Sequence, residues 1–351
     1  HGLSYVLDIY NEKIEPRRNI VDYSLFVSFF PLLVAGPIER ARHLLPQIEK
    51  PRTFDYSKAK DGAKQILGGL FKKIVIAAQY VDLAFNNTET TPGWFLFLAA
   101  ILFAFQIYGD FSGYTDIALG TARILGFELL QNFNFPYFSR DIAEFWRRWH
   151  ISLSSWFKDY LYIPLGGSRG GMAKTIRNTF IIFLVSGFWH GANWTFLVWG
   201  GLHACYMIPL IVRNKNRANT NSVVAENRKL PSFSEFGQLI GTFALVVLAW
   251  IFFRADSVSH ALIYIKNIPL NLLEGQTFRE NGIMIIIKFL CCFFLAAFML
   301  TIEWLGRGDK YALEHTLDRW KTIPRYAFYY LLIILIFLFA GESQNFIYFQ
   351  F

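Results

Sequence analysis

The residue best placed for proton transfer in this sequence is His190, near the middle of the uncharged segment from Asn178 to Val212. A neutral imidazole, with a pKa near about 6.5, takes up and returns a proton close to neutral pH. Gly191 follows it and lets another backbone or a ligand approach closely. We predict that His190 is a general base and that its neighbours Trp189 and Asn193 bind substrate. The alternative is a packed imidazole that donates one hydrogen bond to a carbonyl.

Two further histidines, His150 and His203, are weaker candidates. His150 ends the run WRRWH, and that pattern is equally consistent with a catalytic role and with an amphipathic ring at a membrane surface. His203 follows two glycines in an apolar segment, where packing is the better interpretation. The three histidines are 40 and 13 positions apart, which matches no local metal-ligand pattern, so no metal site is predicted.

Two carboxylates, Asp110 and Asp116, lie six positions apart in an apolar stretch. That spacing does not place them on one face of a helix. In such surroundings a carboxylate either pairs with a cation, such as Arg123 or Arg140, or binds hydroxyl groups. Both interpretations stay open, and both residues are candidate substrate-binding groups.

Cysteine chemistry and nucleotide binding are not expected. The three cysteines lie in apolar runs, which disfavours a disulfide framework, a zinc site or a thiol nucleophile. The glycine-rich loop from Gly166 to Gly171 lacks the Gly-Lys-Ser/Thr ending and the preceding strand of a phosphate-binding P-loop.

The composition indicates that these residues belong to a membrane protein. Of the 351 residues, 54% are hydrophobic and 17% are charged, against roughly 25% charged residues in soluble domains. Several uncharged stretches approach the roughly 20 residues that a membrane-spanning helix needs. The predicted spans are Tyr23–Ile38, Trp94–Gly109, Asn178–Val212, Phe236–Phe253, Gly282–Ile302 and Tyr326–Gly341, with Ala63–Phe85 as a weaker one.

The segment Asn178–Val212 is predicted to reverse inside the membrane. As one helix it would be about 52 Å long, too long for one crossing of a core near 30 Å and too short for two. We place the reversal at Gly191-Ala192-Asn193. The first arm, Asn178 to Trp189, would then rise about 18 Å and leave His190 a little beyond the middle of the membrane. Such a reversal needs surrounding protein or a water-filled cavity.

Basic residues predict the orientation of the chain. Four connections are rich in Lys and Arg, with seven in Glu39–Lys64, seven in Tyr137–Arg177, five in Arg213–Glu235 and five in Gly306–Arg325. Positive connections favour the cytoplasm, so these four are predicted to be cytoplasmic. The connections Asn86–Gly93 and Arg254–Asn281 and the C-terminal tail are predicted to lie outside.

The connection Tyr137–Arg177 also contains apolar residues at helical spacing. They are Ile142, Phe145, Trp146, Trp149, Leu153, Trp156, Phe157 and Tyr160. With Glu144, Arg147 and Arg148 on the other side, this pattern predicts one amphipathic helix along the cytoplasmic interface. Arg147 and Arg148 would face lipid headgroups or an acidic acyl donor, and are therefore candidate substrate-binding residues.

Four ordered motifs resemble those of the membrane-bound O-acyltransferases. They are DFSGYTD from Asp110 to Asp116, FWRRWHISLS from Phe145 to Ser154, YIPLGG from Tyr162 to Gly167 and FWHGANW from Phe188 to Trp194. The likeness is to the bacterial branch that includes the alginate O-acetylation protein AlgI and the D-alanyl transfer protein DltB. A looser likeness covers nearly the whole chain, including the aromatic ending Phe346–Phe351. Family members usually carry further helices before the position of His1. The chain is therefore interpreted as one membrane-embedded domain, residues 1–351, that lacks its N-terminal helices.

The resemblance implies an all-α polytopic membrane bundle, with interfacial or re-entrant helices around a central funnel. In the family the histidine that corresponds to His190 is catalytic, and the one that corresponds to His150 is strongly implicated. The resemblance implies no bound cofactor, and the acyl donor would be acetyl-CoA or an acyl carrier protein thioester. The expected location is the bacterial cytoplasmic membrane. Expected partners are membrane lipid, a polysaccharide acceptor or an extracytoplasmic esterase-like protein, and a cytoplasmic acyl carrier protein, with no nucleic acid.

The leading hypothesis is an O-acyltransferase, most directly an O-acetyltransferase of an exported polysaccharide such as alginate. His190 would be the base, and Asn193 with backbone amides near Gly191 would hold the oxyanion. The alternative is a transporter or flippase for a polar or lipid-linked sugar, with a path along His190, His203 and Asp110. A scaffold without chemistry is a third class, and it would tolerate replacement of His190.

Overall fold

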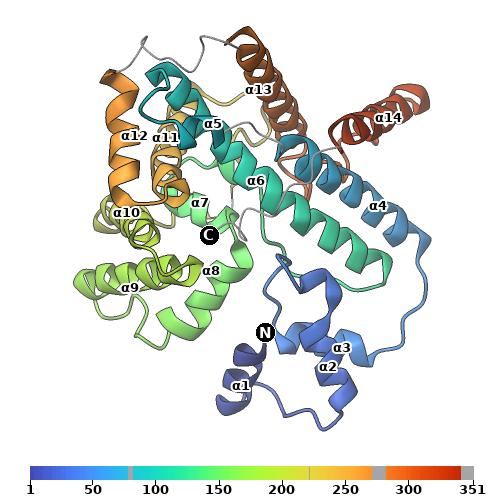
Figure 1. Cartoon of the computed structure of the whole chain (residues 1–351). Coiled ribbons are helices and arrows are strands. Elements are labelled where there is room, and N and C mark those ends of the chain that lie inside the picture. Colours follow the sequence, from blue (N-terminus) through green and yellow to red (C-terminus); the bar gives the residue numbers. More distant parts are fainter. Residues whose placement is uncertain (78–81, 221, 271–281, 341–351) are drawn as a thin grey trace.

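The computed structural model describes residues 1–77, 82–220, 222–270 and 282–340, and within these ranges the chain is helical without any β-strand. The predicted all-α class is therefore confirmed. The long helix α6 (Gly93–Ile124) runs through the centre, with α4 (Tyr56–Leu70) alongside (Figure 1). Five described helices are long and apolar enough to cross a membrane. They are α6, α10 (Trp194–Val212), α11 (Phe233–Arg254), α13 (Gly282–Leu305) and α14 (Thr322–Phe339).

Other elements connect and cover these five helices. The remaining α-helices are α1 (Gly2–Tyr10), α2 (Ile20–Ser28), α3 (Ala41–Glu49), α5 (Asp82–Asn86), α7 (Ile142–Arg148), α8 (Ile151–Phe157), α9 (Met172–His190) and α12 (Val258–Leu270). Two 3₁₀ turns, η1 (Phe30–Leu32) and η3 (Pro136–Phe138), and two π-helical turns, η2 (Phe71–Ile76) and η4 (Lys158–Tyr162), complete the described secondary structure.

The predicted span Tyr23–Ile38 is wrong. Helix α2 has nine residues and ends at Ser28, so it rises only about 14 Å. Pro31 lacks the backbone N–H that a continuing helix needs. The chain then turns so tightly at Gly36 that a Cβ there would lie 2.5 Å from the Pro31 carbonyl oxygen.

The predicted span Trp94–Gly109 is too short, because α6 continues for another fifteen residues to Ile124. Asp110 and Asp116 therefore lie inside this helix and not after it. Glycines let α4 and α6 touch backbone to backbone. A Cβ on Gly62 would lie 2.5 Å from the Gly120 carbonyl oxygen, and a Cβ on Gly113 would lie 2.7 Å from that of Gly69.

The weaker predicted span Ala63–Phe85 is helical through α4 and η2 as far as Ile76. Its residues 78–81 lie outside the described residues, as do 271–281 of the connection Arg254–Asn281 and the C-terminal tail from 341 onward. The other predicted spans at the C-terminal end, Phe236–Phe253, Gly282–Ile302 and Tyr326–Gly341, correspond to α11, α13 and α14.

The four basic connections lie together on one face of the molecule. Side chains join them in pairs, through Lys64 with Asp318 (3.8 Å), Arg40 with Asp159 (3.8 Å), Arg140 with the Ser222 carbonyl (2.9 Å) and Arg307 with the Ala225 carbonyl (3.0 Å). A second set of contacts involves the connections Asn86–Gly93 and Arg254–Asn281, which were predicted to be outside. Asn267 donates to the Thr88 carbonyl (3.2 Å) and joins the two connections, while Arg254 pairs with Asp82 (2.7 Å) and the Asp256 carbonyl accepts from Asn193 (3.1 Å). We call these the basic face and the opposite face.

Candidate functional site

The reversal after His190 is where the sequence predicts it. Helix α9 ends at His190, and α10 begins at Trp194. The first arm is longer than predicted, however, because α9 begins at Met172 and has 19 residues, a rise of about 28 Å. The helix includes Lys174 and Arg177, which the prediction had left in the preceding connection. His190 therefore lies at the end of α9 that is near the opposite face, beyond the middle of the bundle.

Aromatic rings surround the His190 imidazole. Its ring centroid lies 4.9 Å from that of Trp189, 5.2 Å from Trp199 and 5.2 Å from Phe253, each in an edge-to-face arrangement. The glycine that follows is required by packing, because a Cβ on Gly191 would lie 2.6 Å from the Phe196 ring. The α9–α10 hairpin therefore holds the imidazole in a mainly apolar and half-buried environment.

His150 lies at a break between two helices. Helix α7 ends at Arg148, α8 begins at Ile151, and His150 has the left-handed backbone conformation with φ of 44°. The prediction of one continuous helix through this region is therefore wrong. Both sides of the break are hydrogen-bonded to residues 132–134, since the Ile151 N–H donates to the Asn132 carbonyl (2.9 Å) and the Asn134 N–H donates to the Arg148 carbonyl (3.0 Å).

The aromatic residues around this break belong to the core and not to a membrane interface. Phe145 and Trp149 are 1% and 2% exposed. Glu144 and Arg148 are also buried, and Glu144 pairs with both Arg148 and Arg140 at 3.0 Å. The helical spacing of the apolar residues was predicted correctly, but Glu144 and Arg148, on the opposite side of the helix, are also packed against protein. The predicted interfacial placement is therefore wrong for α7.

Arg147 and Arg148, which were expected to face headgroups or a donor, also have hydrogen-bond partners within the protein. Arg148 also donates to the Asn134 carbonyl (3.1 Å), and Arg147 donates to the Asn216 carbonyl (2.9 Å). Both arginines thus join α7 to neighbouring connections. Burial lowers the pKa of the Arg147 guanidinium from its usual value.

His150 and Trp189 meet at a cavity of about 560 Å³. The His150 ring lies 6.2 Å from the Trp189 indole, which also contacts His190, and Phe111 packs edge-on against His150 at 4.7 Å. Phe111 and Ile38 line the cavity as well. The structure therefore brings three of the predicted site residues, His190, Trp189 and His150, to one place.

The predicted carboxylates and Asn193 have other partners. Asp110 pairs with Lys73, and Asp116 pairs with Lys72, so the expected pairing with Arg123 or Arg140 is wrong. These lysines are distant in sequence, and only the packing of η2 against α6 brings them near. The Asn193 side chain accepts from the Thr195 N–H (3.1 Å) and donates to the Asp256 carbonyl (3.1 Å). It is thus the N-cap of α10 and a tether to the α11–α12 connection.

His203 has the packing role that the sequence favoured. It is fully buried in α10, and its Nδ1 accepts from the Trp146 indole N–H at 3.2 Å. Of the path proposed for a transporter, neither His203 nor Asp110 lines the cavity beside His150.

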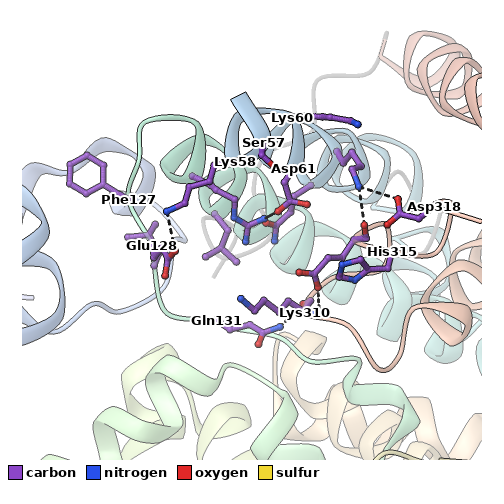
Figure 2. Close-up of a pocket in the computed structure, with 16 residues that line it drawn as sticks. Ser57, Lys58, Lys60, Asp61, Phe127, Glu128, Gln131, Lys310, His315 and Asp318 are labelled. Carbon is purple, nitrogen blue, oxygen red and sulfur yellow. Dashed lines mark hydrogen bonds and ion pairs between the residues drawn. The ribbon is translucent and has the colours of Figure 1, made fainter. Parts of the chain in front are cut away.

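A second cavity, of about 640 Å³, opens on the basic face (Figure 2). It lies between α4, the C-terminal end of α6 and loop 310–318, and ion pairs cross it or border it, such as Lys58 with Glu128 (3.5 Å). Lys58, Lys60 and Lys310, which line this cavity, lie in connections that the sequence predicts to be cytoplasmic. On the same loop Asp309, Glu314 and His315 bring possible metal-ligand atoms within 4.8 Å of one another. Hydrogen bonding to Asp309 raises the pKa of the exposed His315.

Sequence reasoning also missed two residues that position His150. Phe111 packs on its ring, and Ser152 accepts from the Ile38 N–H (2.9 Å) while it donates to the Asn132 side chain. Both lie inside the motifs DFSGYTD and FWRRWHISLS. Membership of those motifs was the signal that could have identified them.

The arrangement of these motifs agrees with comparisons to known proteins. Residues 14–234, more than half of the chain, match the MBOAT, membrane-bound O-acyltransferase family. The chain belongs to the membrane-bound O-acyltransferase family. Together with its five apolar helices, this makes it a multi-pass membrane protein.

Several bacterial members of the membrane-bound O-acyltransferase family are similar to this chain. A probable alginate O-acetylase AlgI of Pseudomonas syringae pv. tomato is 41% identical over 73% of this chain and 48% of its own length. A peptidoglycan O-acetyltransferase of Helicobacter pylori is 35% identical over 95% of this chain and 65% of its own length. A teichoic acid D-alanyltransferase of Bacillus subtilis is 32% identical over 59% of this chain and 55% of its own length. The chain thus spans about half the length of the alginate relatives that it matches.

Proposed function

We propose that this protein is an O-acyltransferase, most directly an O-acetyltransferase, of the bacterial cytoplasmic membrane. It would transfer an acyl group from a cytoplasmic thioester to a hydroxyl group of an exported polysaccharide or of a partner protein. The observation that carries this proposal is the meeting of the two histidine motifs, since Trp189 contacts both His190 and His150 beside the 560 Å³ cavity. The names of the alginate and peptidoglycan relatives support a polysaccharide acceptor.

The proposed reaction needs one base and no resident cofactor. His190 accepts the proton of the acceptor hydroxyl while the hydroxyl oxygen attacks the thioester carbonyl. The new C–O bond forms and the C–S bond breaks, and the imidazolium returns the proton to the departing thiolate. The products are an ester and a free thiol. Backbone amides near Gly191 are the better candidates for the oxyanion, because the Asn193 side chain is occupied by Thr195 and Asp256.

The two faces of the molecule would receive different substrates, the acyl donor on one and the acceptor on the other. Acetyl-CoA or an acyl carrier protein is acidic, and the basic face would attract either from the cytoplasm. The acceptor, or an esterase-like partner that relays the acyl group, would approach from the opposite face, where α9 ends at His190. His150, on the cavity wall, would bind one of the two reacting groups.

The test replaces His190 by Gln in the full-length protein, which is purified and assayed for transfer of a labelled acetyl group from acetyl-CoA or an acyl carrier protein. Losing the base should lower the rate by about 10² to 10⁴, while the amount of protein in the membrane stays normal. Tyr330→Phe, at an exposed position of α14 that has no role in the proposed reaction, is the control and should keep the full rate. A His190→Gln protein that transfers acetyl at the wild-type rate would reject the catalytic role. Sugar transport by a wild-type protein without acyl transfer would favour the transporter.

A further inference from the structure

A cluster of charged and hydrogen-bonded side chains lies inside the bundle where η2, α6 and α13 meet. Lys72 contacts both Asp116 and Glu303, the second at 3.5 Å. The Tyr108 hydroxyl donates to Glu303 at 2.7 Å. The side chains of Lys72 and Glu303 are 11% and 3% exposed. We call Lys72, Tyr108, Asp116 and Glu303 the buried cluster.

Stability alone does not account for these charges. Removing a charged pair from water costs several kcal/mol per ion, and apolar residues of similar volume often stabilise a core as well or better. Ionisable groups inside membrane bundles are accordingly rare and commonly have a function. None of the four residues lines the cavity beside His150, so a direct contact with substrate there is not their role.

The cluster fixes α6, a helix that contacts His150 through Phe111. Two of its members, Tyr108 and Asp116, belong to α6, and Lys73 of η2 pairs with a third α6 residue, Asp110. Lys72 and Lys73 lie in the π-helical turn η2, a local geometry that is frequent at functional sites. Because η2 and α13 contact α6 through these charged and polar groups, rotation or sliding of α6 would separate partners that are largely shielded from water.

Residues adjacent to these α6 anchors support His150. Phe111 follows Asp110 and packs edge-on against the imidazole at 4.7 Å. Thr115 precedes Asp116 and accepts from the Asn132 side chain at 3.3 Å. Asn132 in turn accepts the Ile151 N–H through its carbonyl (2.9 Å) and the Ser152 hydroxyl through its side chain. One face of α6 is thus anchored by charge while the neighbouring face holds the His150 break.

Tyr108 connects the two faces directly. Its hydroxyl belongs to the buried cluster, and its ring lies 6.0 Å from Trp149, the residue before His150. Phe133 contacts both rings, at 5.7 Å from Tyr108 and 5.0 Å from Trp149. A shift of the Tyr108 ring would therefore reach the His150 backbone through two aromatic contacts.

We propose that the buried cluster is a positioning device for His150, which sets the rotation and depth of α6 so that Phe111, Thr115 and Tyr108 hold the imidazole at the cavity. The effect of this positioning on the reaction rate rests on the proposed function, because the placement of His150 limits a rate only if the protein transfers acyl groups. Its members touch no reacting group and are positioning residues.

The decisive variant is Tyr108→Phe in the full-length protein, which keeps the ring and removes the hydrogen bond to Glu303. A misplaced catalytic group lowers the rate of the chemical step and leaves substrate affinity unchanged. We therefore expect kcat to fall about tenfold, while KM for donor and acceptor stays within about twofold of the wild-type value. Carbethoxylation of His150 by diethyl pyrocarbonate, followed by mass spectrometry, should become faster because the imidazole is held less tightly. Glu303→Gln, which still accepts from Tyr108, should lose less rate than Glu303→Leu.

The matched control is Tyr264→Phe. Tyr264 is also fully buried, and its hydroxyl also donates to α6, to the Leu96 carbonyl at 2.7 Å, but it has no contact with the cluster or with His150. This variant should leave both kcat and His150 labelling unchanged. If Tyr108→Phe matches the wild type in kcat or in labelling, or if Glu303→Gln and Glu303→Leu lose equal rate, the positioning role is overturned. If the wild type itself transfers no acyl group, the proposed function fails, and the labelling of His150 still decides the positioning role.

Discussion

His150 has a backbone conformation that few side chains adopt readily. Its φ and ψ of 44° and 53° are left-handed, which costs a non-glycine residue roughly 1–2 kcal/mol. Asn is among the residues that tolerate it best, whereas β-branched residues tolerate it worst. The hydrogen bonds from residues 132–134 on both sides impose this conformation. Strain of this kind persists where surrounding structure over-determines the backbone, which is common at functional sites.

This conformation separates the chemical role of His150 from its structural one. His150→Asn should keep the backbone and the amount of membrane protein, but should lose acyl transfer by about 10²-fold or more if the imidazole takes part. His150→Val should lose the same activity and also unfold at a lower temperature, because a β-branched residue is strained there. Transfer rates and thermal midpoints in detergent measure the two effects. A His150→Asn protein at the wild-type rate would remove His150 from the mechanism, and equal midpoints for the two variants would contradict the strain.

At the residue scale, the sequence identified candidate side chains better than it identified their partners. His190 could be found because an imidazole, glycines and a long uncharged segment coincide within the same few residues. The partner of Asp110 could not, because Lys73 lies 37 positions away and is brought near only by backbone contact between glycines. The burial of Arg148 escaped prediction because helical periodicity continues through the break at His150.

At the element scale, prediction succeeded where hydrophobicity alone determines a helix. Phe236–Phe253 lies within α11 (Phe233–Arg254), because no buried charge interrupts that run. In α6 the two aspartates were taken as the end of a span, although lysines of η2 pair with them. In Tyr23–Ile38 the hydrophobicity was sufficient, but Pro31 and the turn at Gly36 prevent a continuous helix.

The contact between α4 and α6 should depend on glycine. A Cβ on Gly113 would lie 2.6 Å from the Lys73 nitrogen and 2.7 Å from the Gly69 oxygen. Both are backbone atoms and cannot move as a side chain can. Gly113→Ala should therefore destabilise the protein by about 1–3 kcal/mol and lower acyl transfer, because it also disturbs the pair of Lys73 with Asp110.

A glycine in another helix provides the matched control for Gly113. Gly241 lies inside α11, and a Cβ there would meet no atom within 4 Å. Gly241→Ala should leave the thermal midpoint unchanged or raise it slightly, since Ala has the higher helix propensity. Thermal unfolding in detergent and the yield of membrane protein compare the two variants. Equal midpoints for Gly113→Ala and Gly241→Ala would contradict the close packing of α4 on α6.

At the scale of the whole molecule, the two faces give His190 its place in the reaction. The basic connections contact one another on one face, and the connections that contain Asp82, Thr88 and Asp256 contact one another and Asn193 on the other. Helix α9 crosses between them and carries His190 to its far end. The distribution of Lys and Arg predicted this grouping from sequence because orientation depends on charge counts and not on packing detail.

The side of the membrane on which each face lies is the last prediction. Single cysteines at Asn87, Ala218 and Gly308, in a protein whose Cys205, Cys291 and Cys292 are replaced by Ser, should react differently with a membrane-impermeant maleimide. Asn87 is exposed in the connection without basic residues, and Ala218 and Gly308 are exposed on the basic face. Asn87→Cys should react in intact cells, and the other two only after permeabilisation, because basic connections are retained in the cytoplasm. If Ala218→Cys were labelled in intact cells, the α9–α10 hairpin would have the opposite orientation in the membrane to the one predicted here. His190 would then be near the cytoplasm, where it would meet the thioester donor before any exported acceptor.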